Sequence, residues 1–364
     1  MAQKAHEKNQ IMNILAIDTS CDDTSAAITQ GRVVLSNIIS SQHEIHQQWG
    51  GVVPILAKRA HQERIDAVIE KAMQTAKVTK DHIDAIAVTY GPGLSISLEV
   101  GVKKAKELAA LWNKALIAVN HMEGHLFSAF ALPKTIKVDE QNIQFPLLAL
   151  LVSGGHTELV LAKDFGVYEI LGQTLDDAAG EAFDKVARML GLGYPGGAVL
   201  AKMAEDGDEK AYQFPLPLAQ RKDLAFSYSG IKTAAFRLIT SITKEGTVAL
   251  TKQQIADIAA SFQHIAIKHL VKRTEQALKN TKVRALVLGG GVSANILLRK
   301  ALRTLTKKYG IAFYYPKTKN LHMDNAAMIG VAGYYKAQRG EFVKDVAKLD
   351  RDPTVEISEK GAFE

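Results

Sequence analysis

The chain has 364 residues, 47% of them hydrophobic and 23% charged, with 27 Gly and 9 Pro. This composition is typical of a globular protein and excludes an intrinsically disordered or collagen-like chain. The length suits two domains, since one domain usually has about 100–200 residues. The single cysteine, Cys21, excludes an internal disulfide and a zinc site built from thiolates, and it favours a reducing cytoplasm.

The charged residues comprise 45 Lys and Arg against 38 Asp and Glu, a formal net charge of +7. An excess of this size fits transient contact with a polyanion, and it fits an ordinary basic enzyme equally well. No apolar run reaches the roughly 18 residues of a membrane helix, and the polar start of the chain lacks the apolar core of a secretory signal. We therefore expect a cytoplasmic protein with no membrane partner.

The first half of the chain opens with three predicted strands and continues with alternating helices and strands. Apolar segments predict strands at 13–18, 25–30, 32–39, 85–90 and 115–120. Helical spacing of apolar residues predicts helices at 53–77 and 95–112, and another helix is expected to begin at His121.

The second half repeats this order of elements. Strands are expected at 146–155, 157–163, 168–175, 284–291 and 311–316. Helices are expected at 177–190, 198–204, 230–243, 253–278, 294–308 and 325–338. Two halves that share one order indicate an internal duplication and an α/β fold of two related domains.

The domain boundaries follow from these patterns. We expect the first domain at 13–132 and the second, with helical insertions, at 145–324. The last helix, from about 325, is expected to pack back on the first domain. Residues 1–12 are expected to form a flexible leader and residues 341–364 a C-terminal tail.

Three strand ends carry turns of a kind that binds phosphate groups, at 18–24 (DTSCDDT), 152–157 (VSGGHT) and 288–295 (LGGGVSAN). Glycines let a turn approach a phosphate closely, and backbone N–H groups supply donors. None of the three matches the P-loop or the Rossmann fingerprint. One such turn alone is more often an ordinary connection. Three such turns at equivalent places in the two duplicated halves, however, resemble the phosphate and adenosine loops of the actin, Hsp70 and sugar-kinase superfamily.

Two histidines suggest a metal site. His121 and His125 are four residues apart on a predicted helix, so their imidazoles share one face. The HExxH motif of zinc proteases is absent, because Met122 follows the first histidine. Two ligands do not fix a metal, and the alternative is a pair of structural histidines. The candidate third ligands are the carboxylates of Asp18, Asp22, Asp23 and Asp324.

Several motifs occur together and in one order: HMEGH, LVSGGHT, DDAAGEAFDK, YPGG, FSYSGIKT, GGGVSAN and a late Asp-Asn pair. In this combination the chain closely resembles the TsaD family of tRNA N6-adenosine threonylcarbamoyltransferases, over about residues 13–340. The resemblance implies a duplicated actin/Hsp70/sugar-kinase-like fold (ASKHA, RNase H-like) with an interdomain cleft. It implies transfer of a threonylcarbamoyl group from threonylcarbamoyl-AMP to N6 of the adenosine 3′ of the anticodon in tRNAs that read ANN codons.

The resemblance also implies a metal site and a donor site. His121, His125 and Asp324 match the ligands of one Fe(II) or Zn(II) ion. Since these ligands come from both halves of the chain, we expect the metal site between the two domains. The matching positions for the threonylcarbamoyl-AMP donor are Leu151, Val152, Ser153, Gly154, Gly155, Asp184, Gly197 and Asn295.

The partners implied are tRNA, a separate threonylcarbamoyl-AMP synthase, and, typically in bacteria, a TsaB-like paralogue and a small TsaE-like ATPase. The chain departs from the family pattern at Asp18 and Asp23, where glutamate is usual, and at His322 and Ala326, which lie just before and just after the Asp-Asn pair. His322 is either an extra ligand or, as we favour, a solvent-facing side chain.

The chemistry implied is acyl transfer to an exocyclic amine that attacks in its neutral form and loses its proton late. Such a reaction needs positioning and charge stabilisation rather than a strong base. Asp22 or Asp23 is expected to accept the late proton, with capping of the turn as the alternative role.

Two other functions remain open, a catalytically silent RNA-binding paralogue and a kinase of the same superfamily. The paralogue would be expected to lack the histidine pair, and the kinase would not need it. A phosphate-binding rim is expected from Lys103, Lys104 and Lys106 with Arg221, Lys222, Arg299 and Lys300, although a solvated helix face is the favoured alternative.

Overall fold

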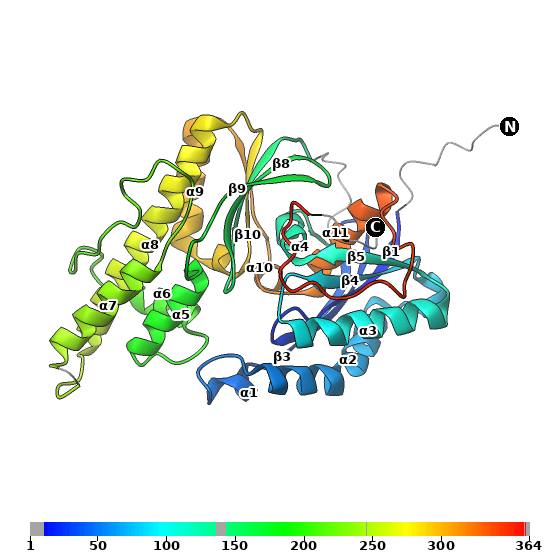
Figure 1. Cartoon of the computed structure of the whole chain (residues 1–364), viewed down its shortest axis with the longest axis horizontal. Helices are drawn as coiled ribbons and strands as arrows, with labels where there is room; N and C mark the ends of the chain where they lie inside the picture. The colour runs from blue at the N-terminus through cyan, green and yellow to red at the C-terminus, as the bar shows by residue number, and fades with distance from the viewer. Residues whose placement is uncertain (1–10, 136–142, 245, 360, 362–364) are drawn as a thin grey trace. The chain divides into compact units, whose positions relative to one another are not determined.

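The computed structural model describes residues 11–135, 143–244, 246–359 and 361. The chain forms two compact units, each built on one β-sheet (Figure 1). Most of the expected leader and the last residues of the expected tail lie outside the described residues. Unit 1 comprises Met1–Gln42, Val53–Asn142 and Met323–Glu364, and unit 2 comprises His43–Val52 and Ile143–His322.

Unit 1 contains a six-stranded sheet with the strand order β5-β4-β1-β2-β3-β6. β1, β2 and β3 form an antiparallel meander, and β4 and β5 add in parallel beyond β1. The strands are β1 (Asn13–Asp18), β2 (Asp23–Gln30), β3 (Val33–Ser41), β4 (Ala85–Gly91), β5 (Ala115–Asn120) and β6 (Leu132–Pro133).

Unit 2 repeats this arrangement in a five-stranded sheet with the order β11-β10-β7-β8-β9. Here β7, β8 and β9 form the antiparallel meander, and β10 and β11 add in parallel beyond β7. The shared strand order and directions confirm the α/β fold and the internal duplication. The strands are β7 (Leu147–Val152), β8 (Thr157–Asp164), β9 (Val167–Gln173), β10 (Ala285–Gly289) and β11 (Ala312–Tyr314).

Helices cover both faces of the unit 1 sheet (Figure 1). On β4, Ile86 and Val88 lie in one core cluster with α2 and α3, whereas Ala87 faces Gly333 of α11. Successive side chains of a strand point to opposite faces, so α2 and α3 cover one face and α11 the other. The elements are α2 (Pro54–Ala76), η1 (Lys80–His82), α3 (Ser95–Trp112), α4 (His121–Ser128) and α11 (Ala326–Gln338).

The C-terminal segment also packs on unit 1. Leu349, Val355 and Ile357 are buried, and the backbone N–H of Asp352 donates to the carbonyl of Tyr90 at 2.8 Å. Part of the expected tail is therefore an ordered component of this unit.

Most helices of unit 2 pack around one large core. The longest, α8, begins at a capping box in which Thr251 and Gln254 each bond the other's backbone N–H. Apolar side chains of α5 to α9 meet one face of the sheet in this core. The elements are α1 (His43–Gln47), α5 (Ala179–Met189), α6 (Gly196–Met203), η2 (Ala204–Asp206), α7 (Ser229–Ile242), α8 (Lys252–Asn280), η3 (Gly291–Ala294), α9 (Ile296–Tyr309) and α10 (Lys319–His322).

In the described part of the chain, no helix is long and apolar enough to span a membrane.

Candidate functional site

The histidine pair lies on α4, a short helix that follows β5 directly. Asn120 starts the helix, because its side-chain oxygen accepts hydrogen bonds from the backbone N–H groups of Met122 (2.8 Å) and Glu123 (3.3 Å). The predicted spacing is confirmed: the rings of His121 and His125 have centroids 4.5 Å apart, and both are buried.

Asp324 reaches the histidines because α11 packs closely against α4. Asn325 caps α11 by accepting from the backbone N–H of Met328, which places Asp324 just before the helix. A Cβ on Gly124 would lie 2.8 Å from Cδ1 of Ile329 on α11. Glycine at this position of α4 therefore permits the approach of the two helices.

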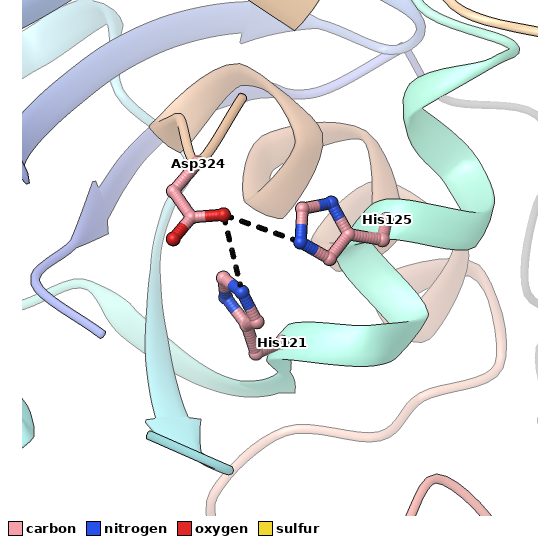
Figure 2. A group of neighbouring side chains, drawn as sticks. All are labelled: His121, His125 and Asp324. Carbon is pink, nitrogen blue, oxygen red and sulfur yellow. Dashed lines mark ion pairs between the residues drawn. The ribbon is translucent and has the colours of Figure 1, made fainter. Parts of the chain in front are cut away.

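Figure 2 shows the resulting group of three side chains. One oxygen of Asp324, Oδ1, lies 3.5 Å from Nε2 of His121 and 3.2 Å from Nε2 of His125. One possible ligand atom from each of the three residues lies within 4.8 Å of the others. Such a spacing lets two imidazoles and a carboxylate hold a single ion.

The ionisation of these groups reflects burial and their closeness. Burial lowers the pKa of His121, but the carboxylates of Asp324 and Asp18 outweigh it and raise that pKa above its ordinary value. Burial and the neighbouring His121 lower the pKa of His125. Burial would raise the pKa of Asp324, but the two rings hold it well below its usual range. The carboxylate is thus charged at neutral pH, as a metal ligand must be.

The surroundings of the group fit a metal ion. The Nδ1 atoms of His121 and His125 are buried and form no hydrogen bond within the described structure. Buried polar atoms are costly unless they have partners. Two imidazoles and one carboxylate are a donor set that suits Zn(II) and Fe(II).

Asp18 lies on the other side of His121. Its Oδ1 is 3.9 Å from Nδ1 of His121, and its Oδ2 is buried with no hydrogen-bond partner in the described residues. Asp18 ends β1, so the predicted turn at 18–24 is the β1–β2 connection. His61 of α2 anchors this connection, since its ring bonds the hydroxyl of Thr24 at 2.7 Å and the carbonyl of Cys21 at 3.0 Å.

Asp22 and Asp23 lie in the same connection and differ in exposure. Asp22 is half-buried, whereas the residue exposure of Asp23 is only 8%. Burial, followed by the neighbouring carboxylate of Asp22, raises the pKa of Asp23 to about 7. A carboxyl group with such a pKa can accept a proton near neutral pH.

Two expectations about this site are wrong. The three ligands do not come from two domains, because His121, His125 and Asp324 all belong to unit 1. His322 is neither solvent-facing nor a ligand: it is buried in unit 2, with Nδ1 2.6 Å from the Ser293 hydroxyl and Nε2 accepting from Arg299 at 3.2 Å. Burial and the Arg299 charge lower the pKa of His322 to about 4.

The residues matched to the donor site lie in unit 2, around the ends of β7 and β10. Leu151 and Val152 are buried on β7, and Ser153 begins the turn to β8. Gly154 and Gly155 are exposed, with open space where a Cβ would stand. This space would let a ligand approach the backbone of the turn.

The turn after β10 packs directly on the turn after β7. Gly290 has φ +85°, and a Cβ there would lie 2.3 Å from the carbonyl oxygen of Val152. Position 290 therefore requires glycine, both because of its left-handed backbone conformation and because it lies so close to Val152. Asn295 follows and caps α9 through its oxygen, while its amide donates to Gln263 at 2.6 Å.

Asp184 and Gly197 meet at the start of α6. Oδ1 of Asp184 accepts from the backbone N–H groups of Gly196 and Gly197, both at 2.8 Å. The first turn of α6 is thus tied to α5 by a carboxylate. Sequence reasoning missed this capping role, as it missed Gly124, because both depend on elements that meet only in the fold.

Comparisons with known proteins agree with these observations. The model of the family "TsaD: tRNA N6-adenosine threonylcarbamoyltransferase" matches residues 33–331. Curated proteins named tRNA N6-adenosine threonylcarbamoyltransferase are similar over nearly the whole chain. The protein of Desulfitobacterium hafniense is 49% identical, with 90% of this chain and 93% of that protein covered. The protein of Dictyoglomus turgidum is 45% identical, and the match covers 96% of this chain and 100% of that protein.

Solved structures with low sequence identity share the fold. HypF of T. kodakarensis has a TM-score of 0.57 at 15% identity, covering 93% of this chain and 49% of that longer protein. Component A of the (R)-2-hydroxyglutaryl-CoA dehydratase of Acidaminococcus fermentans has a TM-score of 0.51 at 15% identity. The match covers 90% of this chain and 99% of that protein. These likenesses support the predicted ASKHA-type fold. On the family match and the near full-length identities of 45–49%, the chain belongs to the tRNA N6-adenosine threonylcarbamoyltransferase family.

Proposed function

We propose that this chain transfers the threonylcarbamoyl group from threonylcarbamoyl-AMP to N6 of the adenosine 3′ of the anticodon in tRNAs that read ANN codons. The observation that carries the proposal is the buried group of His121, His125 and Asp324 in a member of this family. A catalytically silent RNA-binding paralogue would not need three converging ligands. A kinase of the same fold would need no histidine pair.

His121, His125 and Asp324 would hold one Fe(II) or Zn(II) ion. Bound there, the ion would supply Lewis-acid polarisation of an acyl oxygen. Three protein ligands leave positions of the ion open for substrate. The α4–α11 contact at Gly124 and the Asn120 and Asn325 caps would keep the three side chains converged.

Asp18 would orient His121. A metal-bound histidine usually donates its second ring N–H to a carboxylate, which fixes the tautomer and the ring position. Asp18 and Nδ1 of His121 face each other at 3.9 Å, and both lack full hydrogen bonding in the described structure. A small movement would close this hydrogen bond.

We therefore expect Asp18→Ala to weaken metal binding by about 10- to 100-fold, which is typical for removal of such a partner. The measurement is metal affinity by competition with a chelator. Asp18→Glu, which restores the usual family residue, should bind metal as the wild type does. Unchanged affinity in Asp18→Ala would contradict the positioning role.

In unit 2, residues 151–155 with Asp184, Gly197 and Asn295 would bind the adenylate. Backbone N–H groups of the open Gly154–Gly155 turn suit a phosphate. Two hydrogen bonds from the start of α6 hold the Asp184 carboxylate in place, and a carboxylate is a group that accepts from a ribose hydroxyl. Both polar atoms of the Asn295 side chain already have protein partners, so its contribution would come from the second amide hydrogen or the backbone.

In the transfer step, the adenosine N6 forms a bond to the carbonyl carbon, the bond from that carbon to the phosphate oxygen breaks, and AMP leaves. The proton released from N6 would go to Asp23, whose pKa of about 7 suits a base working near neutral pH. Asp22 would support this role by keeping that pKa raised.

For partners, we propose a separate synthase that supplies threonylcarbamoyl-AMP, a TsaB-like paralogue and a small TsaE-like ATPase, with the reaction taking place in the cytoplasm. The test is mass spectrometry of unmodified tRNA after incubation with the chain, the synthase, threonine, bicarbonate and ATP, with and without the two partner proteins. N6-threonylcarbamoyladenosine is expected, and none should form with His121→Ala. Absence of the product in every mixture would overturn the proposal.

Asp184→Ala is expected to weaken AMP binding at least about tenfold and to lower the free energy of unfolding by roughly 1–2 kcal/mol, because two backbone N–H groups lose their acceptor. Isothermal titration with AMP and a denaturant melt measure the two effects. Asp184→Asn keeps an acceptor oxygen and should retain most of the stability. An unchanged AMP dissociation constant in Asp184→Ala would remove Asp184 from the adenylate site.

A further inference from the structure

The excess positive charge of the chain is concentrated in one segment. Residues 296–319, which include α9, β11 and the first residue of α10, contain seven Lys and Arg and no Asp or Glu. Taking these seven from the chain's 45 Lys and Arg leaves 38, which equals its 38 Asp and Glu. The whole net charge of +7 is therefore accounted for by 24 consecutive residues.

Five of these seven side chains belong to α9, and four of the five, Lys300, Arg303, Lys307 and Lys308, are exposed. Leu298, Leu302 and Leu305 point into the core of unit 2, so the helix face opposite them meets solvent. Spacings of three and four residues place the exposed cations of α9 on that face. We call the exposed cations of the segment the α9 basic surface; they are Lys300, Arg303, Lys307, Lys308, Lys317 and Lys319.

Most of this surface is not neutralised within the described structure. Lys308 is 2.6 Å from Glu275, but no carboxylate of the described residues lies within ion-pair distance of the other five cations. On α3 the situation is different. Lys104 is paired with Asp66 and Glu107, each at 3.0 Å, and Lys106 donates to two backbone carbonyls of the C-terminal segment. The α3 part of the expected phosphate-binding rim (Lys103, Lys104 and Lys106) thus has fewer unpaired cations than α9, which itself carries the rim residues Arg299 and Lys300.

An aromatic ring organises part of the α9 basic surface. The guanidinium groups of Arg299 and Arg303 lie 5.6 and 5.7 Å from the ring centre of Tyr315, and the ammonium of Lys317 lies 4.3 Å from it. Arg303 also donates to the Tyr315 hydroxyl at 2.7 Å. Such cation–π interactions restrict long side chains, so the entropic cost of binding a ligand is smaller.

We infer that the α9 basic surface binds the sugar–phosphate backbone of the tRNA substrate. Unpaired cations spaced along a helix match the regular negative charge of a nucleic acid strand. The apolar face of α9 is buried in the core, so it is not free to insert into a lipid surface. From Lys300 onward the exposed face lacks the apolar centre of a stable protein interface. The identity of the RNA rests on the proposed function.

The test is the quadruple variant Lys300→Gln, Lys307→Gln, Lys317→Gln and Lys319→Gln in the full chain. Binding of an unmodified tRNA transcript is measured by fluorescence anisotropy between about 50 and 300 mM salt, where such binding changes steeply. Each lysine that no longer meets a phosphate should lower the slope of log affinity against log salt by about 0.7–0.9. With all four replaced, the slope should fall by up to about 3.6, and affinity near 0.15 M salt should fall at least about tenfold.

The matched control replaces four exposed lysines of unit 1 that have acidic residues nearby in sequence, Lys71, Lys80, Lys344 and Lys348, by Gln. It removes the same charge and should keep most of the wild-type slope. AMP binding and metal content should be unchanged in both variants. An equal loss of affinity in the control, or a wild-type slope in the α9 variant, would overturn the inference.

Two further arms separate this inference from the proposed function and from other ligands. If the α9 variant alone loses tRNA affinity while the wild-type chain forms no modified nucleoside, the surface stands and the proposed function fails. Vesicles of phosphatidylserine and phosphatidylcholine should not bind the chain. Charge-dependent binding to vesicles with unaltered tRNA affinity would assign the surface to lipid and overturn the inference.

Discussion

Asp324→Ala is expected to lower metal affinity by more than about 100-fold, since removal of a direct ligand should exceed the 10- to 100-fold typical of an outer partner. Asp324 is the only carboxylate found to converge with the two histidines among the described residues. His121→Ala and His125→Ala should have the same effect. Metal bound per chain, measured after reconstitution with Fe(II) or Zn(II), checks all three variants, and threonylcarbamoyl transfer should disappear with the metal.

The control is His322→Gln, which alters a histidine only two positions from Asp324 in sequence. Because the His322 ring bonds Ser293 and Arg299 in unit 2, this variant should keep full metal occupancy. Circular-dichroism melts establish that every variant is folded. Full occupancy in Asp324→Ala would remove Asp324 from the ligand set, and loss of metal in His322→Gln would add His322 to it.

The elements that sequence reasoning placed well are those whose local signals are long and consistent. The helix expected at 95–112 is observed at Ser95–Trp112, and it ends where Asn113 adopts a left-handed conformation with φ 52°. The strands expected at 13–18 and 115–120 also have the observed bounds. In each case apolar periodicity and the flanking residues agree with the fold.

The features that sequence reasoning missed depend on distant contacts. The helix α1 (His43–Gln47) is short and polar, and nothing local shows that His46 is fully buried. His322 was expected in solvent because its partners, Ser293 and Arg299, lie 29 and 23 positions away. Likewise, Asp324 follows unit 2 in sequence, but its backbone already belongs to unit 1.

The metal ligands could be identified because their spacing and motif are local, whereas their environment could not. The i, i+4 pattern gives His121 and His125 one helix face, but the close approach of α11 at Gly124 is evident only in the structure. The same holds for Asp23. Its sequence neighbours suggest a capped turn, and burial is what gives the carboxyl a pKa of about 7.

This raised pKa leads to the second large effect. In the metal-free protein, Asp23→Asn is expected to increase the free energy of unfolding at pH 8 by up to about 4 kcal/mol, from a difference of about three pKa units at 1.36 kcal/mol each. The pKa is raised on folding, from 3.8 to about 7. Folded chains therefore bind more protons than unfolded chains between these values, and wild-type stability falls as pH rises through this window.

The measurement is urea unfolding of both proteins at about pH 4, 6 and 8, which cover the lower end, the middle and the far side of the titration. The increase in the free energy of unfolding caused by Asp23→Asn should be small at the lowest pH and largest at the highest, because the amide does not ionise. The exposed Asp81→Asn serves as control and should follow the wild type at every pH. An equal gain at all three pH values would show that Asp23 does not titrate in this range.

Transfer activity tests the second role of Asp23. If its carboxylate accepts the N6 proton, Asp23→Asn should lower kcat by about 10²–10⁴-fold and abolish the rise of the wild-type rate with pH toward 7. A variant that is more stable yet inactive would mean that burial of this carboxylate serves catalysis at a cost in stability. A stabilised variant with wild-type kcat would instead assign Asp23 to the structure of the β1–β2 connection and leave the proton to Asp22 or solvent.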